Sequence, residues 1–465
     1  MIARDFLHDS FQRFPTPMPR RLLLSVIALL TVAHAEQFHA SKRIAKPNLL
    51  VSAKPPPPPP PSRRGLIILA GLLAFATDSN GAMLGAFFSN HLVARGITTT
   101  AIGSGLGISS GIGLLGVAPI APRLIRKLGA ARMMLCSALV YAACRFGMAT
   151  LAPVNNPTIL IRSAAVLLTI QACADACCDI AASTTILTSV PPSERTQAQG
   201  TFQAMRSLGG LIAPPIGGWL YLKGGFGLPF IAFGTFLLLA CMPLLHTVLF
   251  SDASASTQPD TSAASGGGDF SILRVHGIRW LMGTMTIMAA CLSFPSSYFS
   301  PFLKSEWSLN EGFIGLLMMG ATVLFTSASI GAHKLESLIG QVGLLTSGNL
   351  VTAIGFFLIS SLPPFDLLPR TIPIAALSMC CVYAGIGLVF AAASPLCVKL
   401  AEANGFSSDD AASQVTSLWV LAFALAGTTA PPLGGWLAQR YGARWANSVA
   451  GVLAAVSTLP LVWLA

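Results

Sequence analysis

Asp78, Arg145, Asp175, Asp179 and Arg206 are charged residues well inside long apolar stretches in the N-terminal half of this 465-residue sequence. A charge inside an apolar membrane helix is costly and marks a functional site by default. Asp175 and Asp179 are four positions apart and so share one helix face, where two carboxylates can bind a cation or hold an exchangeable proton. We therefore predict that Asp78 belongs to a functional site, that Asp175 can bind a cationic ligand, and that Asp175 and Asp179 are candidates to carry a proton.

The same residues also allow a purely structural explanation. One or both carboxylates of the Asp175 pair would then lie at a helix end, or would form ion pairs with Arg145 or Arg206. Arg206 itself allows two interpretations, because an arginine inside an apolar helix can contact an anionic ligand or can hold a neighbouring carboxylate. The sequence leaves both explanations open.

The elements that carry these residues are apolar helices. Charged residues make up 10% of the sequence and hydrophobic residues 53%, whereas a soluble domain carries roughly 25% charged residues. Twelve apolar runs have near the roughly 20 residues that a helix needs to cross a bilayer. These runs are residues 66–88, 101–120, 133–151, 159–187, 200–222, 228–250, 280–302, 312–330, 343–362, 372–400, 415–437 and 446–464. We therefore expect an all-α polytopic membrane protein with twelve transmembrane helices.

One phrase of the sequence occurs twice. The octapeptide APPIGGWL at residues 213–220 returns as APPLGGWL at residues 430–437, each time in the fifth apolar run of a set of six. A Ser/Ala/Gly-rich stretch between the two sets is typical of a flexible linker. This pattern indicates two pseudosymmetric six-helix bundles related by a parallel repeat. The predicted organisation is a leader and Pro-rich basic segment at 1–64, an N-terminal bundle at 65–250, a central loop at 251–273 and a C-terminal bundle at 274–465.

The N-terminal segment gives conflicting signals. Residues 18–35, MPRRLLLSVIALLTVAHA, have the basic start, apolar core and Ala-x-Ala end of a secretory signal peptide, and a polyproline spacer follows at 55–61. Cleavage would leave Arg63 and Arg64 on the lumenal side, yet the basic first-half loops place the N-terminal side in the cytosol. Three explanations stay open: an unprocessed leader, the first part of a two-step address to a secondary plastid, or a true start at Met18.

Several motifs resemble those of one transporter family. The stretch GTFQAMRSLGGLIAPPIGGWLY at 200–221 resembles the fifth-helix antiporter motif of the major facilitator superfamily. The stretches SGNLVTAIGFFL at 347–358 and AEANGFSSDDAASQ at 401–414 are similar to the vesicular amine transporter branch, especially its vesicular polyamine transporter-like members. This resemblance implies a major facilitator fold and a secondary active transporter that exchanges an organic cation, a mono- or polyamine, against protons. It also implies that Asp78 lies near the cationic substrate.

The resemblance extends to the moving parts. Glycines let helices approach closely and prolines bend a helix, so the repeated phrase is predicted to act as a gate hinge. The gate and hinge candidates are Gly209, Pro214, Pro215, Gly217, Gly218, Pro431, Pro432, Gly434 and Gly435. Tyr298, in a polar break at 295–302, and Arg206 are further substrate-binding candidates. In two places the sequence departs from the family: Arg126 replaces the Asp of the loop motif, and the fourth-helix segment at 167–183 lacks the Arg linked to proton coupling.

Other classes of function find little support. No P-loop, GxSxG, HExxH or zinc-ligand spacing occurs, so we expect no enzymatic activity, no cofactor and no metal site. The net charge of +11 is scattered over the leader and short loops, which argues against nucleic-acid binding. We expect a monomer in a lipid bilayer, in a vesicular, plasma or plastid membrane. Two rival functions remain: a transporter of organic anions or drug-like solutes anchored by Arg206 or Arg145, and a transport-inactive membrane scaffold or sensor.

Overall fold

The structure is a computed structural model of the full chain, which divides into the units 1–60 and 61–465. It describes residues 63–117, 120–189, 195–250, 271–360, 371–406 and 408–462, all within the second unit. The leader at 18–35, the polyproline spacer and all but the last residues of the predicted central loop lie outside these ranges. Within them the regular structure is helical throughout, without a strand.

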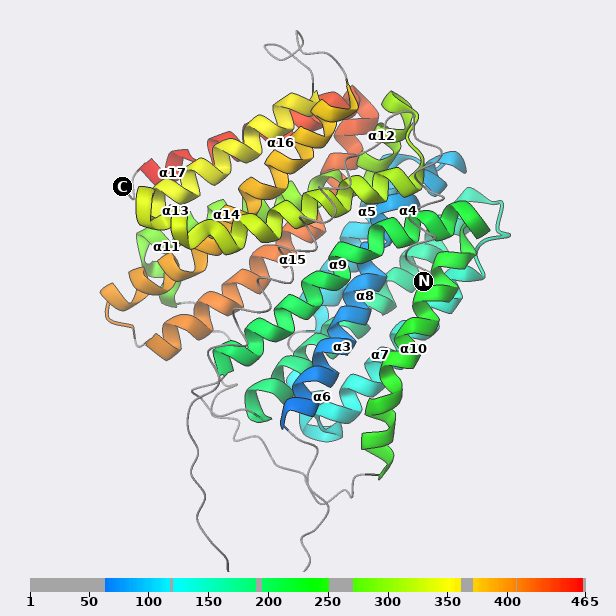
Figure 1. The fold of residues 1–465 in the computed structure, drawn as a ribbon, viewed down its shortest axis with the longest axis horizontal. Helices are drawn as coiled ribbons and strands as arrows, with labels where there is room; N and C mark the ends of the chain where they lie inside the picture. Colours follow the sequence, from blue (N-terminus) through cyan, green and yellow to red (C-terminus); the bar gives the residue numbers. More distant parts are fainter. Residues whose placement is uncertain are drawn as a thin grey trace, which may run out of the picture. The chain divides into compact units, whose positions relative to one another are not determined.

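The helices of the N-terminal half follow the first six apolar runs (Figure 1). They are α3 (Arg63–Ala82), α4 (Leu84–Ala94), α5 (Thr99–Gly111), the π-helical turn η1 (Ile112–Gly116), α6 (Ala121–Leu128), α7 (Ala130–Ala149), α8 (Pro157–Ser189), α9 (Arg195–Gly224) and α10 (Gly227–Phe250). The first run is thus two helices, α3 and α4, which meet at Met83. The short α6 lies in the loop that precedes the third run.

The C-terminal half repeats this arrangement. Its elements are η4 (Ser271–Arg274), α11 (His276–Ser293), the 3₁₀ turn η5 (Phe294–Ser297), α12 (Phe299–Trp307), α13 (Glu311–Ser360), α14 (Ile372–Ala403), α15 (Ser408–Tyr441), α16 (Ala443–Val456) and α17 (Leu459–Val462). The seventh run is broken at η5, the place that matches Met83 in the first run. The eighth and ninth runs both lie in α13, whose backbone leaves helical geometry only at Gly340 (φ 73°, ψ 170°).

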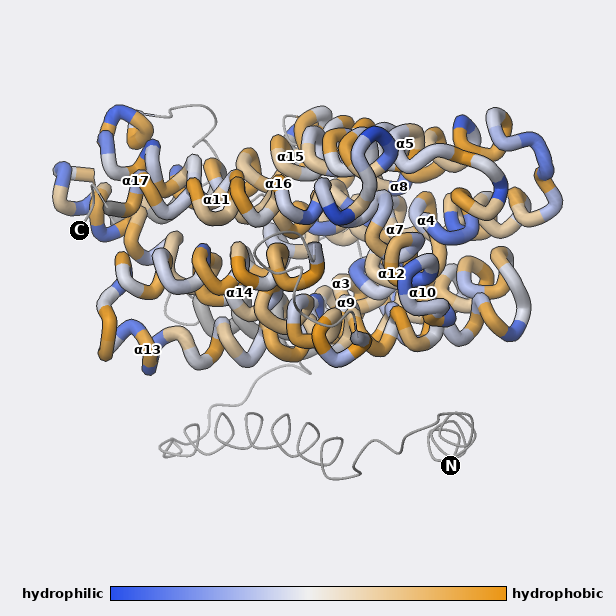
Figure 2. Tube along the Cα trace, turned by 90° about the horizontal axis from the view of Figure 1, so that it is seen from above, coloured by the Kyte–Doolittle hydropathy of each residue, from blue (hydrophilic) through white to orange (hydrophobic). Residues whose placement is uncertain are grey.

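Seven of the described helical segments are long and apolar enough to cross a membrane by length and composition alone. The 50-residue α13 counts once among them although it contains two of the expected runs. Some expected spans fall short because they are broken or brief: α5 has 13 residues and α16 has 14. Figure 2 shows hydrophobic residues along the helices and hydrophilic residues mainly at their ends and turns. This is the distribution that a bilayer requires.

The repeat is visible in the backbone turns. Positive φ angles occur at Gly96 and Ser308, at Gly129 and Gly340, and at Gly225 and Gly442, so three turns recur in both halves. Gly405 adds one more positive φ angle in the described part of the C-terminal half. Each of the four hydrophobic clusters of buried residues draws its members from one half only. The two halves are therefore packed as separate cores with equivalent chain paths.

The repeated phrase lies where the halves meet. In α9, Gly217 faces Met83 at the break between α3 and α4, and Gly218 faces the backbone of Glu311 at the start of α13. In α15, Gly434 faces the carbonyl of Phe294 at the equivalent break, and Gly435 faces the carbonyl of Thr99 at the start of α5. The first glycine of each pair thus contacts its own half, and the second contacts the other half.

The prolines of the phrase join the same contact. The backbone at Pro214 and Pro215 touches Gly315 of α13, and the backbone at Pro431 touches Gly103 of α5. Thr99 Oγ1 donates to the Gly435 carbonyl at 2.9 Å, which adds a hydrogen bond across the halves. Among the described residues, contacts of substance between the halves come only from α4, α5, η1 and α9 on one side and η5, α12, α13 and α15 on the other. The halves are closed at the end that carries the turns at Gly96 and Gly225.

Candidate functional site

Three of the five predicted ionisable residues form one ion-pair cluster. Arg206 of α9 donates through Nε to Asp78 Oδ1 of α3 at 2.8 Å, and through Nη1 to Asp179 Oδ2 of α8. The side chains are about one quarter to one third exposed: 28% for Arg206, 27% for Asp78 and 32% for Asp179. Arg206 therefore joins three helices of the N-terminal half, and the cluster is only partly buried.

The backbone explains how Arg206 reaches both carboxylates. Gly209 lies almost one turn further along α9, and a methyl group there would lie 2.8 Å from Ser79 Oγ and closer still to the Phe75 carbonyl. Only a residue without a side chain lets α9 approach α3 this closely. Gly209 thus contacts its own half and positions Arg206, whereas Gly218 and Gly435 contact the opposite half. The role of Gly209 in gating stays a prediction.

Asp175 lies on the same helix as Asp179 but has a different environment. Its charge interacts with Arg206, Asp179, Asp78 and Arg145. It forms no ion pair at 4 Å or less and no hydrogen bond with any residue that the structure describes. Asp78, Asp175 and Asp179 therefore outnumber Arg206, the guanidinium that forms ion pairs with two of them.

Arg145 of α7 is separate from this cluster and fully buried (0% exposed). Its Nη2 donates to the Asn80 carbonyl and, at 3.3 Å, to the Tyr141 hydroxyl. The guanidinium also lies 5.3 Å from the centroid of the Tyr141 ring and 5.7 Å from that of Phe230. Such ring faces attract a cation. Arg145 has no carboxylate within ion-pair distance among the described residues.

Tyr298 lies in the packed core of the C-terminal half rather than at an open surface. It is 2% exposed, and its hydroxyl donates to Asn447 Oδ1 at 2.8 Å. The break that the sequence predicts around it is present as η5, directly before Tyr298. A substrate contact at Tyr298 stays a prediction, and this position gives it no support.

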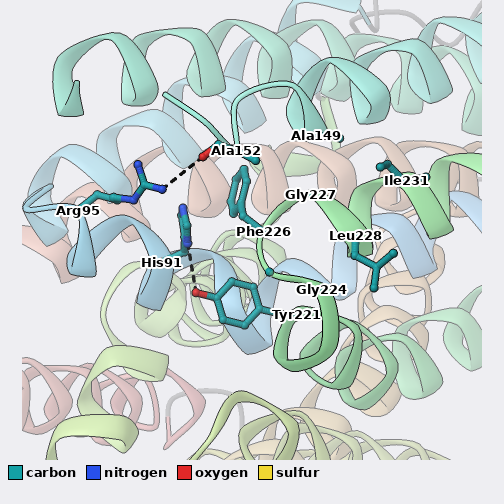
Figure 3. Close-up of a pocket in the computed structure, with 11 residues that line it drawn as sticks. His91, Arg95, Ala149, Ala152, Tyr221, Gly224, Phe226, Gly227, Leu228 and Ile231 are labelled. Atoms are coloured by element: carbon teal, nitrogen blue, oxygen red, sulfur yellow. Dashed lines mark hydrogen bonds between the residues drawn. The ribbon is translucent and has the colours of Figure 1, made fainter. Parts of the chain in front are cut away.

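A surface pocket of about 620 Å³ lies at the closed end of the N-terminal half, where α4, α9 and α10 meet (Figure 3). His91 Nδ1 lies 3.1 Å from the Tyr221 hydroxyl, and the His91 ring stacks on Phe226 with centroids 4.2 Å apart. Arg95 donates to the carbonyls of Val154 and Ala152. This pocket contains none of the predicted site residues and is distinct from the Arg206 cluster.

Sequence reasoning missed the neutral polar residues around Arg145. Gln171 Nε2 donates to the Tyr141 hydroxyl at 3.2 Å, and Asn80 Nδ2 donates to the carbonyls of Ala76 and Phe233. A signal was available, since Asn80 and Gln171 also interrupt apolar runs. The pair between Lys304 Nζ and Glu311 Oε1 (2.5 Å) at the closed end was missed too, because both residues fall at the ends of predicted spans.

A family profile and several relatives match this chain. The profile of the Major Facilitator Superfamily matches residues 67–409. The human MFS-type transporter SLC18B1 is 24% identical over 403 residues, which cover 84% of this chain and 85% of that protein. The mouse protein of the same name is 28% identical over 59% of this chain, and the match spans 58% of its length. The vesicular acetylcholine transporter of Torpedo marmorata is 28% identical over 34% of this chain and 31% of its own.

Solved structures share the fold. A bacterial homologue of the human lysosomal transporter Spinster, in an inward-facing and unoccupied conformation, superposes with a TM-score of 0.68 at 13% identity. That match covers 87% of this chain and 97% of the other. The nucleoside transporter NupG gives a TM-score of 0.62 at 16% identity over 86% and 98% of the two chains. The chain is thus a multi-pass membrane protein with the transporter fold rather than an enzyme, and it belongs to the Major Facilitator Superfamily.

Proposed function

We propose that this protein is a secondary active transporter that exchanges an organic cation, a mono- or polyamine, against protons by alternating access. The observation that carries the proposal is the charge excess at the N-terminal cluster, where Asp78, Asp175 and Asp179 face one paired arginine, Arg206. An ammonium group that leaves water needs a fixed negative charge to replace its hydration. The carboxylates that outnumber Arg206 in this cluster provide such a charge for a cation.

The same geometry argues against the anion alternative. Nε and Nη1 of Arg206 already donate to Asp78 and Asp179, so an anion at this guanidinium would lie beside two carboxylates that repel it. Arg145 is fully buried and its immediate partners are neutral groups. Among the relatives, the Torpedo marmorata protein is named for acetylcholine, which is an organic cation. Its name and that likeness also favour a vesicular membrane for this chain.

The way in which the two halves meet supports alternating access. The close contacts lie at one end, where Gly218 faces Glu311 and Gly435 faces Thr99. Rocking of the two halves about the midplane would break these contacts and open the cluster to the other side of the membrane. In this scheme Asp78 and Asp179 exchange Arg206 for the substrate ammonium, and Asp175 carries the exchanged proton.

The test is uptake into proteoliposomes that contain the purified full chain and a pH gradient. We expect labelled spermidine or a labelled monoamine to accumulate in vesicles with an acidic interior, and accumulation to collapse when a protonophore removes the gradient. Uptake of an organic anion instead, lost in Arg206→Gln, would replace the proposal with the anion alternative. Failure of every solute class to move would support the scaffold or sensor alternative.

A further inference from the structure

Arg145 has more donors than partners. Its side chain is 0% exposed, yet Nε and Nη1 have no hydrogen-bond partner in the described part of the chain. Leaving a charged donor unpaired in a buried position is strongly unfavourable. An arginine in this state needs an acceptor, at least during part of the working cycle.

Unpaired acceptors lie around the same guanidinium. Asn80 Oδ1 and Gln171 Oε1 are buried and also have no partner among the described residues. Asn80 accepts from Arg145 through its main-chain carbonyl, and Gln171 reaches Arg145 through the shared Tyr141 hydroxyl. The buried polar network between α3, α7 and α8 is thus only partly satisfied, which is costly at low dielectric and favours an additional partner.

Asp175 is the carboxylate best placed to complete this network. It lies four residues after Gln171 on α8 and therefore on the same helix face. Its charge interacts with that of Arg145 and with the Tyr141 hydroxyl group. The other cation nearby, Arg206, already donates to Asp78 and Asp179. Of the described charged residues in the Arg206 cluster and the Arg145 network, the carboxylate of Asp175 and the guanidinium of Arg145 are therefore the two without an ionic partner in this conformation.

We propose that Arg145 is the positioning cation of Asp175: it takes up the ionised carboxylate and releases it when a proton binds. This inference rests on the proposed proton exchange and assigns its control to one residue. When Asp175 is ionised, the unpaired Nε and Nη1 groups of Arg145 hold its oxygens. When a proton from the acidic compartment adds to a carboxylate oxygen, the ion pair opens and Arg145 keeps its bonds to Asn80 and Tyr141.

Other charged groups act on Asp175 as well. The charged and titratable groups that interact with Asp175 from neighbouring helices are Asp78 of α3, Arg145 and Tyr141 of α7, and Arg206 of α9. On α8 itself they are Asp179 and Cys178. The segments α5 and η1 contain no titratable residue, and Arg123 and Lys127 of α6 are exposed. Arg206 already forms ion pairs with two carboxylates, so its removal would change several groups at once. Removal of Arg145 therefore tests the electrostatic effect on Asp175 alone.

The experiment measures the protonation of Asp175 directly. Infrared difference spectra of the full chain in lipid nanodiscs, recorded against pH, show the carbonyl band of protonated carboxyl groups, and Asp175→Asn identifies the contribution of this residue. We expect Arg145→Gln to move the titration midpoint of that band to higher pH by about one unit or more, a tenfold change in the protonation equilibrium. Arg145→Lys keeps the charge and should stay within about half a unit of the parent. Arg95→Gln, which removes a guanidinium bonded to carbonyls at the closed end, should leave the midpoint unchanged.

Two further results keep the inference falsifiable. If Arg145→Gln does not insert, Asn80→Asp gives Arg145 a permanent carboxylate partner and should move the midpoint in the same direction. A folded Arg145→Gln or Asn80→Asp protein with the parent midpoint overturns the inference, as does an equal shift in Arg145→Lys. The proposed function is tested apart from this, because the infrared titration needs no cargo. Parent protein that carries no spermidine would reject amine transport and leave the titration result standing.

Discussion

A single methyl group at Gly218 should shift the conformational equilibrium of the transporter. Gly218 of α9 faces the backbone of Glu311 in the opposite half, and an added Cβ would lie far inside contact distance of that carbonyl oxygen. Backbone cannot rotate away as a side chain can, so the halves must separate at this point. Overpacking of a tight contact costs about 1–3 kcal/mol, which corresponds to roughly a 5- to 150-fold change in the ratio of two states. Gly218→Ala should disfavour the closed end by that factor.

The assay measures the distance between the halves at this end. Fluorophores attached to noncanonical amino acids at Ala94 and Arg440, both exposed, report on separation by energy transfer without use of the native cysteines. Gly218→Ala should lower the population with high transfer, and Gly435→Ala should do the same, because Gly435 faces the Thr99 carbonyl at the equivalent contact.

Gly210→Ala is the matched control. Gly210 lies in the same helix, and a Cβ there would have no atom within 4 Å. The gain in helix propensity is the same for both substitutions, so any difference between them comes from the contact between the halves. Equal energy transfer in Gly218→Ala and Gly210→Ala would refute the reasoning that this contact holds the end closed.

Two further predictions concern stability and topology. Lys304→Met should lower the free energy of unfolding by about 1–3 kcal/mol, because it leaves the buried Glu311 carboxylate (4% exposed) without its partner. The control is Lys399→Met, which removes an exposed pair with Glu336 at 3.9 Å and should change the free energy of unfolding by less than about 0.5 kcal/mol. Equal losses of stability in thermal melts of the two variants would contradict this prediction. Cysteines introduced at Ala130 and Ser265 should both react with an impermeant reagent from the same face of the membrane, since the basic loops predict a common cytosolic side; labelling from opposite faces would reject the topology.

The sequence predicted most of the fold because apolar runs and a repeated octapeptide can both be recognised without knowledge of tertiary contacts. The apolar runs appear as helices, and the repeated octapeptide indicates two equivalent halves. The end of each run is less predictable. The break at Met83 depends on tertiary packing, because the missing side chain of Gly217 lets α9 lie directly against it. At Gly340 a single residue with positive φ joins two expected spans, where the sequence predicted a loop.

The charged residues of the Arg206 cluster were predictable from the sequence, whereas their pairing was not. Asp78, Asp179 and Arg206 stand out as charges in apolar runs, yet the sequence allowed Arg206 to bind either an anion or a carboxylate. The choice depends on the rotation of α9 against α3, which Gly209 fixes through its contact with Phe75 and Ser79. Tyr298 was expected beside the cavity because it lies in a polar break. Its hydroxyl faces Asn447 instead, a partner 149 residues away that no local pattern reveals.

The central claim is that fixed negative charge at the N-terminal cluster binds a cationic substrate, and Asp78→Asn tests it most directly. The substitution keeps the shape and the pair between Arg206 and Asp179 while it removes one negative charge from the cluster. A charge about 6 Å from the substrate ammonium contributes about 3 kcal/mol at an effective dielectric constant of about 20, or roughly 100-fold in affinity.

The measurement is the KM for labelled spermidine in proteoliposomes with an imposed pH gradient, beside Glu336→Gln as a control that neutralises an acid in another helix. The account predicts at least a ~10-fold rise in KM, or complete loss of uptake, in Asp78→Asn and parent behaviour in the control. Parent KM values in both Asp78→Asn and Asp175→Asn would contradict it.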